Sequence, residues 1–246
     1  MAENTVSARM GIYLEQLYLD VLIADDLRSK IESKVYQEYE RLPSEQQLCE
    51  VYHVQKMTVR ASLQILKNEG VIFSVPKSGY YVKPARIKKD IRRFQSTTDL
   101  LQSQGRECRT QILRLEVRQA DSALARQAGI EPRTQMYFLE RLRMVDGTSI
   151  AIEQSYIPAD LFPGLMTNDL GVMSLYQVLA QQYNVQTDRA EMEVAIVCAG
   201  EHEAQLLSVE QGDPLIKESG RVYDRIGRMI EYTESFLLID RFQFIS

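Results

Sequence analysis

Cysteine, long apolar runs and a leader segment are scarce or missing in this 246-residue sequence. The three cysteines, Cys49, Cys108 and Cys198, are odd in number and widely spaced, which argues against a disulfide framework and a thiolate metal site. We expect them to be reduced core residues. No apolar run approaches the ~20 residues that cross a bilayer. The start, MAENTVSARMGIY, lacks the basic and apolar regions of a signal peptide, so we expect a cytoplasmic protein without a membrane partner.

Histidine is scarcer still, which bears on catalysis and cofactors. Only His53 and His202 occur, far apart and without carboxylates at ligand spacing, so a metal site or a Ser-His centre has little to build on. The sequence also shows no nucleophile with a base at workable spacing and no Gly-rich phosphate loop. We therefore expect no catalytic residue, no metal and no cofactor.

Charge is distributed unevenly along the chain. The hydrophobic fraction of 45% and the charged fraction of 26% are typical of a globular protein, and the length allows two domains. The net charge is −5, but residues 41–93 hold eleven Lys and Arg against four acids, a local excess of seven positive charges. The remainder therefore carries −12. This division predicts a basic module that meets a polyanion and an acidic module with another task.

The front module, residues 12–84, has the pattern of three helices and a hairpin. Apolar residues at helical spacing predict the first helix: Leu19, Leu22, Ile23, Leu27 and Ile31. Ser44 and Gln47 form a capping-box pattern that begins a second helix ending near Tyr52. A break at residues 53–54 precedes a third helix, which Gly70 ends. Two strands, 71–74 and 80–83, follow around a turn with Pro76 and Gly79, which completes a winged helix-turn-helix.

The residue types at the start of the third helix suit the major groove of DNA. Lys56, Thr58 and Arg60 are polar or cationic, while Val59 and Leu63 point inward. The free amides that open the second helix at Ser44 suit a phosphate. The hairpin tip would lie toward the minor groove or the backbone. The ordinary alternative is that these residues form the solvated face of a small helical domain.

Residues 42–82, LPSEQQLCEVYHVQKMTVRASLQILKNEGVIFSVPKSGYYV, resemble the signature of the GntR family of bacterial transcription regulators. Gln55-Lys56 stands where Ser-Arg is usual in that family, so the operator is expected to differ from the usual one. The resemblance implies operator contacts at eleven positions: Arg41, Ser44, Gln46, Gln55, Lys56, Met57, Thr58, Arg60, Lys77, Ser78 and Gly79.

Residues 85–95 are basic and lack hydrophobic periodicity, which predicts a linker. From residue 96 to 246, alternating patterns predict six strands at 110–118, 135–145, 150–157, 190–198, 215–223 and 229–238. Helical patterns lie at 98–104, 120–128, 174–183 and 200–209. Hairpin turns at DGTS and DRIG favour an antiparallel sheet with helices packed on it, an α+β domain.

One predicted strand of this rear domain carries a candidate anion site. Arg141 and Arg143 lie two residues apart and so share a face, where two guanidinium groups repel unless an anion or water lies between them. Glu153 on the next strand is a candidate acceptor for hydroxyl or amine groups. Ser174 and Tyr176 begin a helix whose free amides suit an oxyanion. The ordinary alternatives are an ion-paired or solvated arginine face and a core tyrosine.

The segments YFLERLRMVDGTSIAIEQSYIP, SLYQVL and the terminal DRFQF resemble the effector-binding UTRA domain of the HutC subfamily, which has the chorismate lyase fold. The resemblance implies phosphate binding by five residues: Ser96, Arg141, Arg143, Ser174 and Tyr176. It implies sugar binding by Glu153 and Glu231. The expected protein is a homodimeric repressor whose grip on double-stranded operator DNA is modulated by a small anionic effector such as a sugar phosphate. A lyase-like enzyme and a constitutive DNA-binding dimer are the alternatives.

Overall fold

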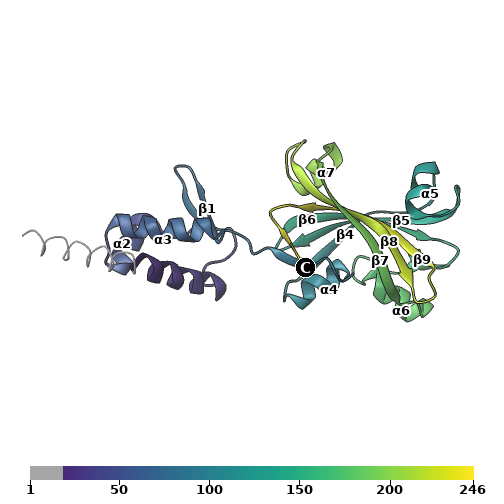
Figure 1. Cartoon of the computed structure of the whole chain (residues 1–246), viewed down its shortest axis with the longest axis horizontal. Helices are drawn as coiled ribbons and strands as arrows, with labels where there is room; N and C mark the ends of the chain where they lie inside the picture. Colours follow the sequence, from purple (N-terminus) through teal and green to yellow (C-terminus); the bar gives the residue numbers. More distant parts are fainter. Residues whose placement is uncertain (1–18) are drawn as a thin grey trace, which may run out of the picture. The chain divides into compact units, whose positions relative to one another are not determined.

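The computed structural model describes residues 19–246 and divides into two compact units that meet between Ala85 and Arg86 (Figure 1). Residues 12–18 of the predicted front domain lie outside the described residues. Each unit has its own hydrophobic cluster and is considered by itself. No helix among residues 19–246 is long and apolar enough to cross a membrane.

The first unit contains a helix over residues 19–32, helices α2 (Glu45–Tyr52) and α3 (Lys56–Asn68), and strands β1 (Ile72–Val75) and β2 (Gly79–Val82). The three helices and the hairpin enclose one core: Ile23, Ala24, Leu27, Leu42, Leu48, Val59, Leu63, Leu66, Ile72 and Val82. The predicted inward stripe is wrong at its beginning, because Leu19 and Leu22 are 41% and 48% exposed. Leu22 lies beside the buried row, and Leu19 lies one turn before it.

Local capping sets the helix boundaries of this unit. The Ser44 side chain accepts from the Gln47 amide and the Gln47 side chain accepts from the Ser44 amide, which confirms the predicted capping box. His53 ends α2 in the left-handed region with a φ of 52°, and α3 begins three residues later. Gly70, with a φ of 73°, follows the C-cap of α3 and lets the chain turn into β1. The predicted helix, turn, helix and hairpin are confirmed.

The second unit is built on a six-stranded antiparallel sheet with the order β4-β5-β6-β9-β8-β7. Its strands are β4 (Cys108–Gln119), β5 (Gln135–Val145), β6 (Thr148–Pro158), β7 (Thr187–Cys198), β8 (Pro214–Asp224) and β9 (Met229–Leu238). Its helices are α4 (Thr97–Ser103), α5 (Ser122–Ala128), η1 (Leu165–Thr167), α6 (Leu175–Tyr183) and α7 (Glu201–Leu207). The predicted antiparallel α+β domain is confirmed.

Part of the predicted linker is structured. Strand β3 (Ile87–Asp90) pairs in parallel with β10 (Phe242–Ile245), the last strand of the chain. Ile87 is fully buried and packs in a cluster with Phe242 and with Leu101 of α4. The predicted linker over residues 85–95 therefore contains a strand that its sequence pattern did not predict. Residues 87–90, IKKD, contain one apolar residue, so their sequence gives no strand pattern. The partner strand β10 lies some 150 residues later in the chain.

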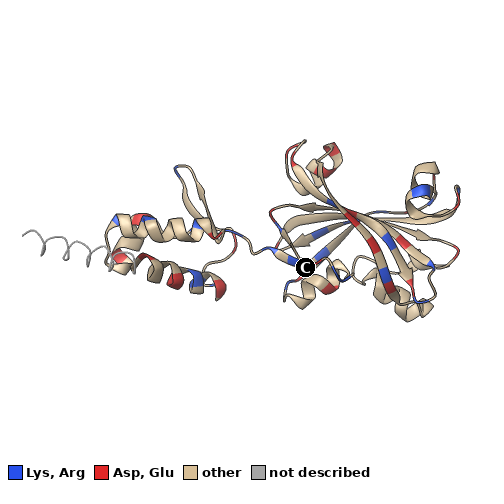
Figure 2. Cartoon of the chain, in the orientation of Figure 1, with Lys and Arg blue, Asp and Glu red and all other residues tan. Residues whose placement is uncertain are grey.

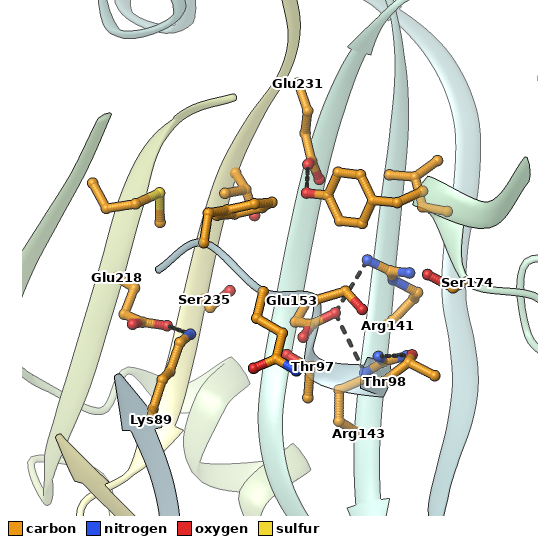
Figure 3. A pocket seen from close by; sticks show the side chains of 17 residues that line it. Lys89, Thr97, Thr98, Arg141, Arg143, Glu153, Ser174, Glu218, Glu231 and Ser235 are labelled. Carbon is orange, nitrogen blue, oxygen red and sulfur yellow. Dashed lines mark hydrogen bonds and ion pairs between the residues drawn. The ribbon is translucent and has the colours of Figure 1, made fainter. Parts of the chain in front are cut away.

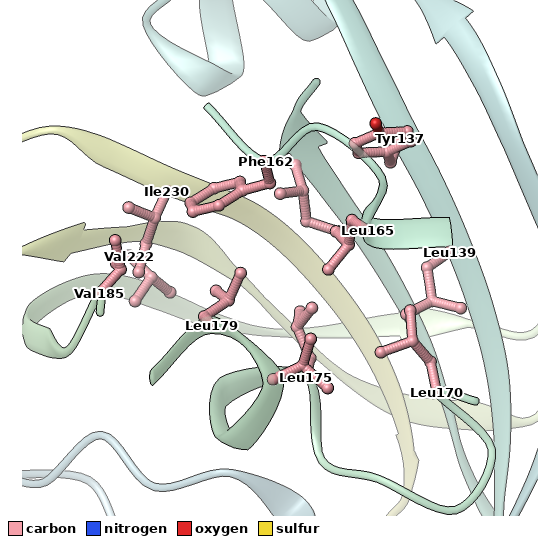
Figure 4. Packing of buried hydrophobic residues seen from close by; sticks show 12 residues of the cluster. Tyr137, Leu139, Phe162, Leu165, Leu170, Leu175, Leu179, Val185, Val222 and Ile230 are labelled. Carbon is pink, nitrogen blue, oxygen red and sulfur yellow. The ribbon is translucent and has the colours of Figure 1, made fainter. Parts of the chain in front are cut away.

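Helices lie against both faces of the sheet. Figure 1 shows α5 and α7 on one side of the sheet and α4 and α6 on the other. A large apolar cluster between the sheet and α6 is drawn in Figure 4: Tyr137, Leu139, Ile157, Phe162, Leu165, Leu170, Leu175, Val178, Leu179, Val185, Val222 and Ile230. Each fully buried aliphatic side chain contributes about 1.5–3 kcal/mol from apolar burial, so this cluster firmly fixes α6 against the sheet. Successive residues of a strand alternate faces, so Arg141 and Arg143 share the side of Leu139.

Candidate functional site

The candidate DNA-binding surface of the first unit lies at the start of α3 and on the hairpin. Figure 2 shows basic residues at one end of α3 and at the hairpin tip. The side chains of Lys56 and Arg60 are each 59% exposed, and both pair with Glu45, at 3.3 Å from Lys56 Nζ and 3.0 Å from Arg60 Nε to Glu45 Oε2. Exposed ion pairs of this kind are worth about 0–1 kcal/mol, so a DNA phosphate can replace Glu45 at small cost.

The hairpin tip and Arg41 lie together. Lys77 and Gly79 form the turn with φ values of 61° and 121°, and a Cβ added to Gly79 would lie 3.3 Å from Arg41 Nε. Glycine therefore gives both the backbone conformation and the space that Arg41 occupies. The hydroxyls of Ser78 and Tyr81 are hydrogen-bonded at 2.6 Å, which braces the tip.

The other predicted DNA contacts are exposed with one exception. Gln46, Gln55 and Ser44 are exposed, and Met57 is 76% exposed. Thr58 is only 4% exposed, so its side chain is part of the packing beneath α3 and is not available to a base. Its place in the third position of α3 turns it toward the core, next to the buried Val59.

The second unit contains a polar pocket that all seven predicted effector residues line: Ser96, Arg141, Arg143, Glu153, Ser174, Tyr176 and Glu231. They come from β5, β6, β9 and the first residues of α4 and α6. The charged residues of this set lie on strands of the sheet, and the N-terminal ends of α4 and α6 border the pocket beside them (Figure 3). Residues from five separate segments thus meet at one place.

Arg141 and Arg143 are held in place by buried contacts. Arg143 donates to Thr110 Oγ1 at 2.6 Å and to Thr98 Oγ1 at 2.7 Å, and its side chain is 3% exposed. Arg141 lies directly opposite Glu153 in the β5–β6 register, with its Nη2 3.1 Å from Glu153 Oε2. Arg141 Nε is buried and has no hydrogen-bond partner among residues 19–246. An acceptor oxygen in the pocket would satisfy this donor.

Glu153 forms ion pairs with both guanidinium groups. Its Oε2 lies 3.1 Å from Arg141 Nη2 and 3.4 Å from Arg143 Nε (Figure 3). Burial acts to raise the pKa of Glu153, but Arg143 and Arg141 outweigh it and hold the pKa below its ordinary value. The site therefore already holds one anionic group between two cations, at the position where a ligand anion would compete.

The start of α6 offers further donors. Ser174 is 4% exposed and caps this nine-residue helix without making a side-chain hydrogen bond to it, so its hydroxyl is available to a ligand. Tyr176 donates a hydrogen bond to Glu231 and packs edge-on against Phe94 at 5.4 Å. Ser96, by contrast, is engaged as the N-cap of α4: its hydroxyl accepts from the Asp99 amide at 3.1 Å and donates to Asp99 Oδ2 at 2.6 Å. A ligand oxygen at Ser96 would have to share that hydroxyl.

Replacing Glu231 with Gln is expected to raise the melting temperature at pH 8 by roughly 2–4 °C, the size of a ~1 kcal/mol change in a chain of this length. Burial raises the pKa of Glu231, although hydrogen bonds from Ser155 and Tyr176 act in the other direction. A raised folded-state pKa adds stability below the ordinary value of 4.5, and that stability is lost as the pH rises through the raised pKa. Gln stays neutral and its Oε1 can still accept from Tyr176.

Thermal unfolding of the wild type and E231Q at pH 4.5 and pH 8 checks this expectation, and the gain should be confined to pH 8. E153Q serves as the opposite case, because the pKa of Glu153 is lowered and its carboxylate stabilises the folded state at neutral pH. An E231Q protein that melts below the wild type at pH 8 would contradict the stated role of burial.

The sequence patterns missed several lining residues, above all one ion pair. Lys89 of β3 and Glu218 of β8 form a salt bridge within the pocket. Lys89 had been placed in the linker, and Glu218 has no signal that separates it from other strand residues. Other missed lining residues are Phe94, Gln95, Thr97, Thr98, Leu175, Met192, Thr233 and Ser235.

Residues 19–246 contain no cluster of three or more His, Cys, Asp or Glu that could hold a metal ion. The three cysteines are free thiols, and Cys49 and Cys108 are half-buried. Cys198 is exposed, so the expectation that it belongs to the core is wrong. It lies at the end of β7, an edge strand with a neighbour on one side only.

A winged helix-turn-helix unit joined to a unit with a charged pocket defines a ligand-responsive DNA-binding regulator. The chain belongs to the GntR family of bacterial regulatory proteins, in the HutC-type branch that carries a UTRA domain. The family described as "Bacterial regulatory proteins, gntR family" matches residues 20–82, and the family described as "UTRA domain" matches residues 103–243. The predicted family and fold class are confirmed.

Relatives extend this similarity over most of the chain. The mannosyl-D-glycerate transport/metabolism system repressor MngR of Escherichia coli K12 is 29% identical over 90% of this chain and 92% of its own. The repressor NagR of Bacillus subtilis is 25% identical over 91% of both chains. The crystal structure of PhnF from Mycobacterium smegmatis has the same fold, with a TM-score of 0.71, 22% identity and coverage of 91% of this chain and 97% of its own. These comparisons point to transcription regulators and argue against an enzyme.

Proposed function

We propose that this protein is a cytoplasmic repressor that binds operator DNA as a homodimer and whose affinity for the operator is modulated by a small phosphorylated sugar or a similar anion. The predicted operator-contacting residues of the first unit, except the buried Thr58, would contact the DNA. The seven pocket residues would hold the effector. The observation that carries the proposal is the pair of buried arginines around Glu153, with a buried and unpartnered Nε on Arg141.

The chemistry of the pocket favours an anion joined to a polyol. A phosphate has enough acceptor oxygens to take both guanidinium groups, the Ser174 hydroxyl and the amides at the start of α6. Glu153 would then give up part of its contact with the arginines and accept hydrogen bonds from ligand hydroxyls. Glu231, beyond Tyr176, offers a second acceptor. The relatives' names agree with a sugar-derived ligand, since one is a mannosyl-D-glycerate system repressor and another a probable fructoselysine utilization operon repressor.

Features of both units favour a dimer. GntR regulators usually bind DNA as dimers, and two recognition helices related by a two-fold axis would meet a palindromic operator about one helical turn apart. Edge strand β7 exposes a row of apolar side chains on one face, Met192, Val194 and Ile196, at 37%, 50% and 64%. An edge with free backbone groups and apolar side chains is a surface that a second copy of the chain would cover.

One observation favours a different role for the pocket. Glu153 already pairs with both Arg141 and Arg143, and Glu218 pairs with Lys89, so each of these three cations has a carboxylate partner without a ligand. In that case the protein would be a constitutive DNA-binding dimer with a structural ion-pair network. The two roles differ in one measurable respect, which is whether any anion that binds the pocket changes operator affinity.

The test has two stages and uses the full chain. Thermal-shift screening with a library of phosphorylated sugars finds a ligand, since a compound that binds only the folded state stabilises it by ~2.7 kcal/mol at 100 times its Kd. A DNA site selected by the protein from random duplexes is then titrated with and without that ligand. We expect a change in operator affinity of roughly 5–150-fold. A bound ligand that leaves operator affinity unchanged would leave the constitutive role as the better account.

A further inference from the structure

Lys89 differs from the other charged residues of the pocket in the element that carries it. Arg141, Arg143, Glu153, Glu218 and Glu231 all lie on strands of the six-stranded sheet. Lys89 lies on β3, which pairs only with β10 in a separate two-stranded sheet. Among the charged lining residues that the structure describes, it is therefore the one outside the main sheet.

Strand β3 is also the first element of the second unit. It begins at Ile87, two positions after Ala85, the last residue of the DNA-binding unit. It is held by four register pairs with β10 and by the flanking hydrogen bonds from the Ile87 amide to the Arg241 carbonyl at 2.7 Å and from the Ile91 amide to the Ile245 carbonyl at 3.0 Å. Ile87 anchors the start of β3 in a buried cluster, and it is the only buried residue among the four of this strand. In β5, by contrast, every residue from Met136 to Arg143 is buried, so a shift of the Lys88–Asp90 part of β3 disturbs far less packing than a shift of β5 would.

Lys89 and its ion-pair partner Glu218 both line the pocket. Its Nζ forms the ion pair with Glu218 Oε2, and the side chains are 19% and 6% exposed. Figure 3 shows this pair on the other side of Glu153 from Ser174. The ammonium group has three donor hydrogens, of which Glu218 uses one. The positive charge of Lys89 also helps to lower the pKa of Glu153. Its effect is smaller than those of burial, which raises this pKa, and of Arg143 and Arg141, which lower it.

We propose that Lys89 is a ligand-contacting residue that ties occupancy of the pocket to the position of β3, and hence to the segment that leads into the DNA-binding unit. This rests on the proposed effector function of the pocket. A ligand oxygen that draws the ammonium group from Glu218 favours one placement of β3 over another. A ligand can shift such an equilibrium only through contacts that differ between the two placements, and Lys89 provides one. The arginines on β5 hold the anion in both.

The test replaces both partners of the pair, because a lone Glu218 would remain buried and unpaired. Lys89→Met/Glu218→Gln is compared with the wild type and with Lys88→Met, whose lysine is the exposed neighbour on the same strand. The probe is the tightest binder among inorganic phosphate and a panel of sugar phosphates. The measurements are its Kd, operator affinity with and without it, and hydrogen exchange at the Ile87 and Ile91 amides.

The double variant is expected to keep probe affinity within about tenfold and ligand-free operator affinity near the wild-type value. Its ligand-induced change in operator affinity should fall from the ~5–150-fold expected of the wild type to below about threefold. The probe should alter exchange at the two amides in the wild type and in K88M, and not in the double variant. A double variant that responds like the wild type overturns the role of Lys89 alone. A wild type that binds no probe, or binds one without any change in operator affinity, overturns the effector function and this inference with it.

Discussion

An Arg141→Ala/Arg143→Ala/Glu153→Gln variant is expected to bind the effector at least 100-fold more weakly while still binding the operator. Each buried guanidinium makes charge-assisted hydrogen bonds worth about 1.5–3 kcal/mol, and every 1.4 kcal/mol is tenfold in affinity. Glu153 is changed as well because it would otherwise be left buried without its two partners. The measurements are ligand titration followed by thermal shift, and operator binding by the same protein.

Arg109→Ala is a matched control for this variant. Arg109 lies on β4, next to β5 in the sheet, but its side chain is exposed and does not line the pocket. Its loss should leave ligand affinity within about twofold, since surface substitutions have small effects. If the triple variant folds, binds the operator and keeps wild-type affinity for the ligand, the arginines are structural and the anion site lies elsewhere.

The strands of the second unit could be predicted because their evidence is local. β5 and β9 have the predicted limits at both ends: β5 ends just before the DGTS turn, β9 begins just after the DRIG turn, and both have the alternation of faces that every strand has. The same alternation places Arg141 and Arg143 on one face without knowledge of the fold. The short turn at residues 146–147 starts the pairing of β5 and β6, but that register alone would put Ile152 opposite Arg141. A bulge between Arg143 and Met144 shifts the register by one residue and brings Glu153 there, which the local pattern does not record.

The parts that the sequence did not predict depend on distant partners. β3 becomes a strand because β10 lies beside it, and Lys89 enters the pocket because Glu218, 129 positions later, receives its ammonium group. Thr58 is buried beside Val59 although Lys56, Met57 and Arg60 on the first turns of α3 are exposed. Neither local propensity nor alternation records such contacts, which exist only once the chain has folded.

Arg60→Ala is expected to weaken operator binding by about 1–3 kcal/mol, or roughly 5–150-fold. Arg60 projects from the exposed side of α3, where Glu45 is its one partner among residues 19–246, so the whole guanidinium group can turn to a guanine edge or a phosphate. The control is Arg28→Ala, an arginine of the same unit that pairs with Glu69 and lies outside the predicted DNA surface. Glu45→Gln should act in the opposite direction, because it releases Arg60 and Lys56 and removes a negative charge near the phosphates. Titration of the selected DNA site at two salt concentrations separates the effects: R60A that binds like R28A would remove α3 from the interface.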